Sequence, residues 1–361
     1  MKKVTKKERK TFEPGTIVQG YEIIKLVGQG SYGDIYHVKK QNTDFSCALK
    51  VEYTLSIKKA LAKEYNFFKQ LNNLPYFPAF YEYKEAINLK CLAMELLGPS
   101  LTDVRKILPN KSYSISSTIR LGIEILRALE AFHSLGFIHR DVKPSQVLIR
   151  PNRSHPIALI DFGLSRRYLT DEGEYVSPRN RPGYVGTARY ASLNAQRGKE
   201  QGRRDDLFSW FFSLLELYTG EFPWAVSKER KEIFRAKLNA DIHSFLVEKG
   251  FPEQFWVIYR LIKSLRVKDE PNYKLIYAYL MDALKSVNGS MDDGYEWESL
   301  PPEEMAKLSE INLIPGPEAG QPLPPTDLPR LLEKEEIDDL QTEFSSDELN
   351  FVDKMNQCAG F

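Results

Sequence analysis

The sequence predicts an α+β fold with two lobes, a small β-rich N-terminal lobe with one main helix and a larger helical C-terminal lobe. In the first part of the chain, short runs rich in aliphatic and aromatic residues are typical of strands, and they surround one helical pattern at 58–71. The strand-like runs lie at 21–27, 34–38, 46–51, 80–83 and 90–94. Farther along, apolar residues recur at helical spacing instead, in 117–133, 208–218, 253–265 and 273–284.

The composition is typical of a soluble globular chain. Of the 361 residues, 42% are apolar and 12% aromatic, which allows a large core. No run approaches the roughly 18 apolar residues of a membrane span, and the charged start, 1–10, lacks the apolar stretch of a secretory signal. Cys47, Cys91 and Cys358 are too scattered for a disulfide framework or a zinc cluster. We therefore expect a monomer in the cytoplasm or nucleus, with no membrane partner and no specific nucleic-acid partner.

Charge is distributed unevenly along the chain. Residues 290–361 contain 18 acidic and 4 basic residues, whereas residues 1–289 contain 31 acidic and 46 basic residues. Prolines mixed with acids after Asn288 mark a segment that lacks a core of its own. The expected organisation is a basic leader at 1–19, a folded domain at 20–298 with lobes at 20–95 and 101–298, and an acidic, Pro-rich, largely disordered tail at 299–361.

Gly28, Gly30 and Gly33 form a G-x-G-x-x-G pattern between two of the predicted strands. Alone this pattern is a weak signal, because it also occurs in dinucleotide-binding folds, where a helix begins after the last glycine. Here a second strand-like run, 34–38, follows Gly33 at once. The pattern therefore predicts a hairpin whose backbone N–H groups lie over the phosphates of a nucleotide.

Lys50 lies inside an apolar strand, seventeen residues after Gly33. A buried lysine needs a partner of opposite charge. The helical run 58–71 offers Glu64, although a glutamate on a helix is more often solvated. We expect Glu64 to hold Lys50 where it can contact nucleotide phosphates.

Two loops carry the acidic residues of the predicted catalytic site. The segment His139-Arg140-Asp141-Val142-Lys143-Pro144-Ser145-Gln146 is followed, twenty residues after its aspartate, by Asp161-Phe162-Gly163. Either tripeptide alone could be an ordinary loop, but their order and separation resemble the catalytic and metal-binding loops of protein kinases. By this resemblance Asp141 accepts the proton of the substrate hydroxyl, Lys143 neutralises phosphate charge, and Asp161 with Gln146 holds Mg²⁺.

The resemblance to protein kinases also implies an ATP pocket. Glu95 and Leu97 would offer backbone groups to the adenine edge, with Met94 behind the pocket. Asp103 would accept hydrogen bonds from the ribose hydroxyls. The implied apolar walls are Val27, Ile35, Ala48, Leu148 and Ile160.

Longer motifs resemble one kinase group, casein kinase 1 with its tau-tubulin kinase branch, over residues 20–298. The group is indicated by Met94-Glu95-Leu96-Leu97-Gly98-Pro99-Ser100-Leu101, by Ala191-Ser192-Leu193-Asn194 in place of Ala-Pro-Glu, and by Arg203-Arg204-Asp205-Asp206-Leu207. The branch is indicated by Lys143-Pro144-Ser145, Pro178-Arg179-Asn180, Pro271-Asn272-Tyr273 and Tyr295-Glu296-Trp297-Glu298.

This second resemblance implies a serine/threonine kinase that uses ATP and Mg²⁺ and accepts protein substrates with acidic or phosphorylated sites. Arg189 and, nearby, Lys228 match the residues that bind the substrate's anion in this group, whereas Glu221 departs from the group's pattern and would repel a phosphate. Gln146 departs as well, because it replaces the asparagine that binds the second Mg²⁺ in most kinases. Its extra methylene moves the amide oxygen by roughly 1 Å, so Mg²⁺ fits less well and Mn²⁺ could substitute. The alternative is a catalytically weak or inactive pseudokinase scaffold.

The acidic tail gives one further expectation. Because it is tethered to a basic body, it has a high effective concentration at the basic surfaces of that body. We expect a cis contact with the acceptor surface around Arg179, Arg181, Arg189 and Lys228. The alternative is a solvated extension without such a contact.

Overall fold

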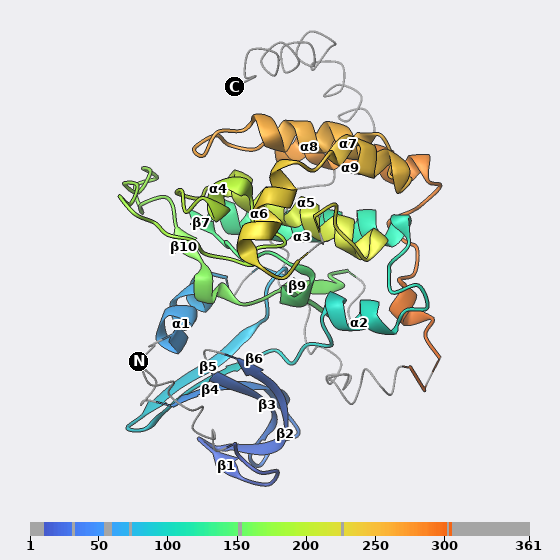
Figure 1. The fold of residues 1–361 in the computed structure, drawn as a ribbon. Coiled ribbons are helices and arrows are strands. Elements are labelled where there is room, and N and C mark those ends of the chain that lie inside the picture. The colour runs from blue at the N-terminus through green and yellow to red at the C-terminus, as the bar shows by residue number, and fades with distance from the viewer. Residues whose placement is uncertain are drawn as a thin grey trace. The chain divides into compact units, whose positions relative to one another are not determined.

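The computed structural model describes residues 11–30, 33–53, 60–71, 74–150, 154–224, 227–301 and 303–304 of the chain. They form two compact units, each with its own elements (Figure 1). The first unit is built from the chain up to Pro99 and from Ile149–Gly163, and the second from Ser100–Leu148 and Leu164–Met305. Residues 1–10 of the predicted leader and nearly all of the predicted tail lie outside the described residues, so both stay predictions.

An antiparallel six-stranded sheet dominates the first unit, with its strands in the order β1-β2-β3-β4-β6-β5. The strands are β1 (Ile17–Val18), β2 (Tyr21–Gly30), β3 (Gly33–Lys40), β4 (Ser46–Tyr53), β5 (Phe80–Ala86) and β6 (Leu89–Met94). The sheet is strongly curved in Figure 1. Register shifts at Ile23/Lys25 and Leu26/Gly28, where β2 pairs with β3, contribute to this curvature because a bulge bends its strand.

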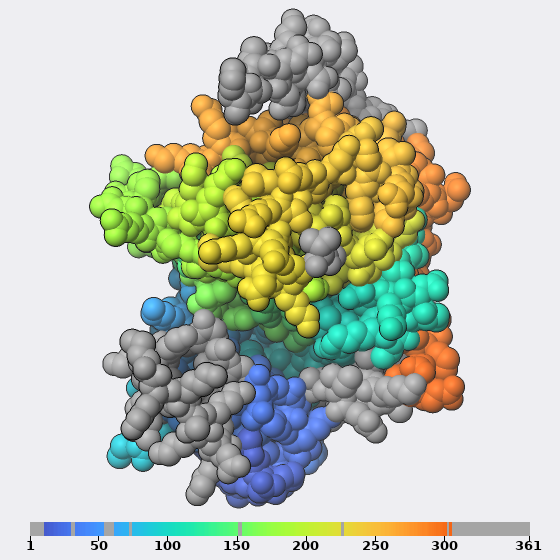
Figure 2. Space-filling view, viewed as in Figure 1, coloured from blue at the N-terminus to red at the C-terminus, as the bar shows by residue number. Residues whose placement is uncertain are grey.

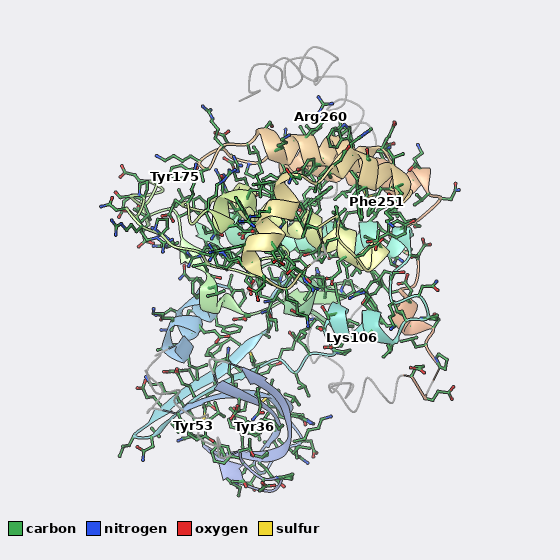
Figure 3. The ribbon with its side chains drawn as sticks, viewed as in Figure 1. Tyr36, Tyr53, Lys106, Tyr175, Phe251 and Arg260 are labelled. Carbon is green, nitrogen blue, oxygen red and sulfur yellow. The ribbon has the colours of Figure 1, made fainter. Side chains whose placement is uncertain are left out.

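The two faces of this sheet differ, because successive side chains of a strand point to opposite sides. One face forms an apolar core whose buried members are Val18, Tyr21, Ile23, Tyr36, Val38, Cys47, Leu49, Val51, Cys91 and Ala93. The ring of Phe12 covers Tyr36 and Tyr53, which both lie on the sheet in Figure 3, at centroid distances of 5.8 and 6.0 Å. The alternate residues of β3, β4 and β6 therefore point to the opposite face, Lys50 among them.

Helix α1 (Ala60–Leu71) packs against β4, β5 and β6. The first unit also contains β9 (Ile157–Leu159), after which Phe162 opens the 3-10 helix η2 (Phe162–Leu164). The Phe162 ring packs against Phe67 and Phe68 of α1 and against Phe77, with centroid distances of 5.7–6.0 Å. This aromatic cluster fixes the position of the neighbouring Asp161 relative to α1.

The second unit is helical, with α3 (Ile115–Ser134) and α5 (Arg203–Thr219) at its centre. Every residue of α5 from Asp205 to Leu217 is buried. The two helices approach closely at Gly122, because a Cβ there would lie 3.0 Å from Leu214, and Trp210 donates a hydrogen bond to the Gly122 carbonyl. Helices α8 (Gln254–Ser264) and α9 (Tyr273–Ser286) pack on this pair as an outer layer (Figure 1).

Shorter elements complete the second unit. They are α2 (Leu101–Ile107), α4 (Leu193–Gln196), α6 (Arg230–Leu238), α7 (Ile242–Glu248), β7 (Phe137–Ile138), β10 (Arg166–Arg167), η1 (Pro144–Gln146), η3 (Glu296–Glu298) and the start of β8 (Val147–Ile149). In Figure 2 the yellow residues around α6 form part of the surface of this unit. Among the described residues, no helix has the length and apolar character needed to cross a membrane.

The α+β class, with a β-rich and a helical part, is confirmed, and the structure corrects several element ends. α3 begins at Ile115, two residues before the expected 117, because Ser114 caps its start by accepting a hydrogen bond from a backbone N–H group. α9 begins at Tyr273 as expected, behind the Asn272 cap, and ends two residues later than expected, at Ser286. α5 begins five residues before the expected 208. The sequence analysis did not predict α2, α6 and α7, because helices of seven to nine residues contain too few apolar positions to establish a period.

Candidate active site

Lys50 and Glu64 form the ion pair that the sequence predicts, with 2.5 Å between Nζ and Oε2. Strand β4 carries Lys50 to the face opposite the apolar core, and α1 presents Glu64 there. Both side chains are buried, at 10% and 6% exposure. Removing either partner would leave an uncompensated buried charge, so the pair holds the ammonium group in one place.

Apolar residues beside Lys50 on this face remain partly open to solvent. Val27, Ile35 and Met94 are half-buried, whereas the core on the other face is closed. The strand register sets Ile35 opposite Lys50 and Ala48 opposite Met94. A half-open apolar surface next to a fixed positive charge can bind a flat ligand that carries phosphate groups.

The glycine pattern lies in a hairpin, as predicted, since β2 pairs with β3 as far as Gly30 and Gly33. No helix follows Gly33, which excludes the dinucleotide-binding interpretation. Gly33 has φ +144°, and a Cβ there would lie 2.4 Å from the Val51 carbonyl oxygen, so only glycine fits. The hairpin tip, residues 31–32, lies outside the described residues.

Glu95 has a side-chain partner that the sequence analysis did not identify. The guanidinium of Arg150 donates to both carboxylate oxygens of Glu95, at 2.7 and 2.9 Å, and also to the carbonyls of Pro75 and Phe77. The backbone N–H of Glu95 donates to the Ala79 carbonyl at 2.8 Å. A ligand can therefore use the carbonyl of Glu95 but not its N–H, and the side chain serves to fix the segment.

Asp161 adopts a left-handed backbone conformation, with φ +67°. Its Oδ1 accepts a hydrogen bond from the N–H of Gly163 at 3.2 Å. An aspartate in this conformation is strained, and such strain persists only where neighbouring contacts, here the packing of Phe162, hold it. Within the described residues, no group of three or more His, Cys, Asp or Glu side chains could hold a metal ion.

In the second unit, Asp141, Lys143 and Thr187 form a closed triangle of hydrogen bonds. Lys143 Nζ donates to Asp141 Oδ2 at 2.6 Å and to Thr187 Oγ1 at 2.9 Å, and Thr187 donates to Asp141 Oδ1 at 2.6 Å. Asp141 is 8% exposed. The triangle places a buried carboxylate beside a hydroxyl group and a positive charge.

Asp206 holds the loop that carries Asp141. Its carboxylate accepts hydrogen bonds from the backbone N–H groups of His139 and Arg140, both at 2.7 Å, and from His133 at 2.9 Å. Burial alone would raise the pKa of Asp206, but the contacts with His133 and with His139 lower this pKa below its usual range. Asp206 is therefore a carboxylate that fixes the loop that carries Asp141.

The other residues predicted to contact the nucleotide or the metal are found in both units. Asp103 is at the start of α2, where its carboxylate accepts hydrogen bonds from Ser100 at 2.7 Å and from Lys106 at 2.9 Å. Leu148 and Gln146 are half-buried in the second unit. In the first unit, Leu97 is buried and Ile160 is half-buried.

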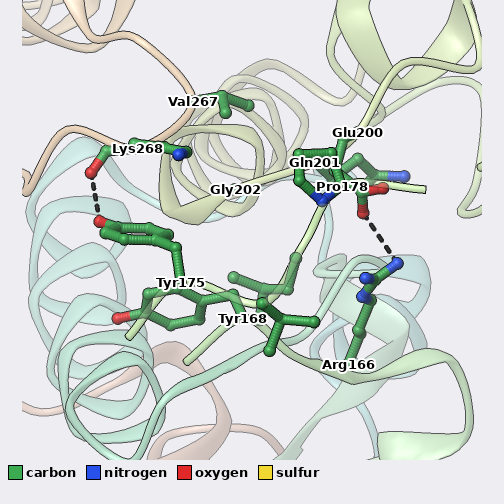
Figure 4. Close-up of a pocket in the computed structure, with 11 residues that line it drawn as sticks. Arg166, Tyr168, Tyr175, Pro178, Glu200, Gln201, Gly202, Val267 and Lys268 are labelled. Atoms are coloured by element: carbon green, nitrogen blue, oxygen red, sulfur yellow. Dashed lines mark hydrogen bonds and ion pairs between the residues drawn. The ribbon is translucent and has the colours of Figure 1, made fainter. Parts of the chain in front are cut away.

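Arg179, which belongs to the expected acceptor surface, forms an ion pair in the structure. Its side chain contacts the carboxylate of Glu200 at 3.2–3.3 Å, and its backbone N–H donates to the same group at 3.1 Å. Arg166 pairs with Glu200 at 3.0 Å, and this pair lines the small pocket in Figure 4.

Arg189, Lys228 and Glu221 are also expected at the substrate-binding surface. Arg189 is half-buried and Lys228 is exposed. Glu221, the residue expected to repel a phosphate, pairs with Lys249 at 2.5 Å.

Comparison with known proteins identifies the family. Residues 21–271 match the model of the protein kinase domain. The chain belongs to the protein kinase family. The matched region of this kinase begins at β2 and ends just before α9. A probable serine/threonine-protein kinase of Dictyostelium discoideum is 35% identical over 290 residues, which are 80% of this chain and 58% of that protein. The chain thus spans little more than half the length of that relative.

Proposed function

We propose that the protein is a serine/threonine protein kinase that transfers the γ-phosphoryl group of ATP to hydroxyl groups of protein substrates. The triangle of Asp141, Lys143 and Thr187 carries this proposal. In it a carboxylate already accepts a hydrogen bond from a hydroxyl group, and a lysine lies within 3 Å of both. An acceptor serine or threonine needs the same two neighbours.

The nucleotide and metal are proposed on the chemistry of the side chains. ATP supplies the phosphoryl group, and Mg²⁺ neutralises the charge of its phosphates when bound. Lys50, which Glu64 holds at 2.5 Å, would bind phosphate oxygens. Asp161 and Gln146 provide carboxylate and amide oxygens, which are the ligand types that Mg²⁺ prefers. Asp141 would orient the acceptor hydroxyl and accept its proton, while Lys143 offsets the charge of the transferred group.

We also propose membership of the casein kinase 1 group, tau-tubulin kinase-like branch, with a preference for acidic or phosphorylated sites. Arg189 and Lys228 are the proposed anion-binding residues. The ion pair of Glu221 with Lys249 supports this preference, because it offsets the negative charge that would oppose a phosphate there. For the tail we propose the cis contact with the acceptor surface around Arg179, Arg181, Arg189 and Lys228. We also propose that the protein acts in the cytoplasm or the nucleus.

The second candidate function is a pseudokinase scaffold, and Gln146 is the observation that favours it. A radiolabelled ATP assay with casein, run with Mg²⁺ and separately with Mn²⁺, distinguishes the two functions. Phosphate transfer that depends on a divalent metal supports the kinase. Nucleotide binding without transfer, with either metal, would favour the scaffold.

A further inference from the structure

Lys237 is a buried lysine that the proposed chemistry does not use. It belongs to α6, whose other basic residue in the last turn, Arg235, is exposed, yet Lys237 is only 6% exposed. Its ammonium group donates three hydrogen bonds, to the carbonyls of Ala191 at 2.8 Å, Arg189 at 2.9 Å and Ala188 at 3.2 Å. All three acceptors lie in one short segment that directly follows Thr187.

The surroundings of Lys237 act on its ammonium form in two opposite ways. Burial lowers the pKa of Lys237 well below its usual range, because it removes water from the charged group. Two aromatic faces oppose that effect, since Nζ lies 4.4 Å from the ring centroid of Trp224 and 4.6 Å from that of Phe212. Three carbonyl acceptors oppose it as well, because only the ammonium form has three N–H donors.

The same three carbonyls are held by a second set of donors. Gln196 Nε2 donates to Ala188 O at 2.9 Å and to Ala191 O at 3.2 Å, and Trp224 Nε1 donates to Arg189 O at 3.0 Å. Each carbonyl therefore accepts one hydrogen bond from Lys237 and one from a neutral side chain. Among these donors, only Lys237 reaches all three carbonyls.

The held segment, residues 188–191, is continuous with the catalytic triangle. The N–H groups of Tyr190 and Ala191 donate to the Thr187 carbonyl at 3.0 and 2.9 Å, so fixing 188–191 also fixes Thr187. Thr187 in turn donates to Asp141 at 2.6 Å. The path from Lys237 to the Asp141 carboxylate thus consists of short hydrogen bonds and one peptide segment.

We propose that Lys237 is a positioning residue that holds segment 188–191 against α6, and thereby sets how a protein substrate is presented to Asp141. The expected effect of Lys237 on substrate kinetics rests on the proposed kinase function. Its effect on the position of segment 188–191 does not. Loss of Lys237 should affect the substrate protein far more than the nucleotide. Nucleotide contacts are proposed for other elements, chiefly the β2–β3 hairpin and Lys50 of β4.

The test compares the full chain with Lys237→Met, Lys237→Arg and Lys231→Met. Lys231 is an exposed lysine of the same helix, so its change to methionine is the matched control. For Lys237→Met we expect kcat/KM for casein to fall on the order of ten- to hundredfold, about 1.4–2.7 kcal/mol at 1.36 kcal/mol per tenfold. The affinity for MgADP, measured by calorimetry, should stay within about twofold of the wild type. Lys231→Met should match the wild type in both measurements.

A second readout does not need enzymatic activity. Hydrogen exchange at the amides of Tyr190 and Ala191 should accelerate at least about tenfold in Lys237→Met and stay unchanged in Lys231→Met. A general loss of fold would instead accelerate exchange throughout α3 and α5. If the wild type transfers no phosphate, the proposed function fails while the exchange result still decides the role of Lys237.

Lys237→Arg keeps the cation between the two rings. It tests the role of Lys237 even if Lys237→Met does not fold. The planar guanidinium cannot donate to three carbonyls in the same way, so we expect an intermediate loss of kcat/KM, about three- to tenfold, with intermediate exchange. Wild-type kcat/KM and wild-type exchange at residues 190–191 in a folded Lys237 variant would overturn the proposal. An equal loss of kcat/KM for casein and of affinity for MgADP would also overturn the proposal.

Discussion

Replacing Arg150 with methionine would remove the four-way contact that ties Glu95 to the loop before β5. In the structure the guanidinium donates to both oxygens of Glu95 and to the carbonyls of Pro75 and Phe77, and its side chain is 10% exposed. Methionine preserves much of the apolar stem but leaves the carboxylate without its positive partner. Glu95 would keep the hydrogen bond from the Ala79 N–H.

The expected size of the effect follows from the exposure of Glu95. Breaking a buried ion pair by removing one partner costs about 3–5 kcal/mol. Because 21% of the Glu95 side chain reaches solvent and can be hydrated, the lower end applies, about 3 kcal/mol. For a domain of this size that loss corresponds to a decrease in Tm of about 6–12 °C. ATP affinity should fall as well, because the carbonyl of Glu95 is a proposed adenine contact.

The assay is urea unfolding of the wild type, Arg150→Met, Glu95→Leu and the double variant. Arg235→Met, at an exposed position of α6, serves as the control for loss of an arginine. The double variant should lose no more stability than either single variant, which gives a coupling free energy of about 2–3 kcal/mol. A loss of unfolding free energy under about 0.5 kcal/mol in Arg150→Met would refute this expectation. So would a double variant whose loss equals the sum of the losses in the two single variants.

Three further predictions concern the metal, the catalytic loop and the tail. Gln146→Asn should raise phosphate transfer with Mg²⁺ and narrow any preference for Mn²⁺, because the shorter amide restores the ligand's reach; equal rates with both metals before and after the change would show that Gln146 is not a ligand. Asp206→Asn should destabilise the protein at pH 7 in urea unfolding. Because the pKa of Asp206 is lower in the folded protein than the unfolded value of about 3.9, the ionised carboxylate stabilises the fold above about pH 4. The difference in free energy of unfolding between wild type and variant should therefore shrink as pH falls below about 4; a pH-independent difference would contradict this. A chain ending at residue 300 should show a lower KM for an acidic peptide than the full chain, and the gap should close as salt rises; identical KM values across the salt series would mean that the tail makes no contact.

Local patterns account for what the sequence predicts correctly. The strands of the first unit have a period of two, which also separates Lys50 from the apolar core on the other face. The contact of Lys50 with Glu64 could be inferred because a buried charge in a strand needs a partner and one helix follows nearby. The loops at Asp141 and Asp161 were recognised by residue type and spacing, which do not depend on packing.

Contacts between distant segments account for what the sequence analysis missed. Arg150 and Glu95 are 55 positions apart, and Lys237 and Ala191 are 46 positions apart, so no local period links them. One signal was present in α6, where Lys237 lies four residues after the buried Ile233 and thus on the same helix face. A lysine on the apolar face of a short helix identifies a candidate, but it does not identify the three carbonyls that it binds.

Asp141 and Asp161 are proposed to have different roles in one phosphate transfer, as proton acceptor and as metal ligand. The most direct measurement pairs radiolabelled phosphate transfer to casein with calorimetry of MgATP binding, for the wild type, Asp141→Asn and Asp161→Asn. We predict that both variants lose transfer, that Asp141→Asn keeps the nucleotide affinity of the wild type, and that Asp161→Asn binds MgATP more weakly. Phosphate transfer that persists in Asp141→Asn, or an equal loss of nucleotide affinity in both variants, would contradict the claim.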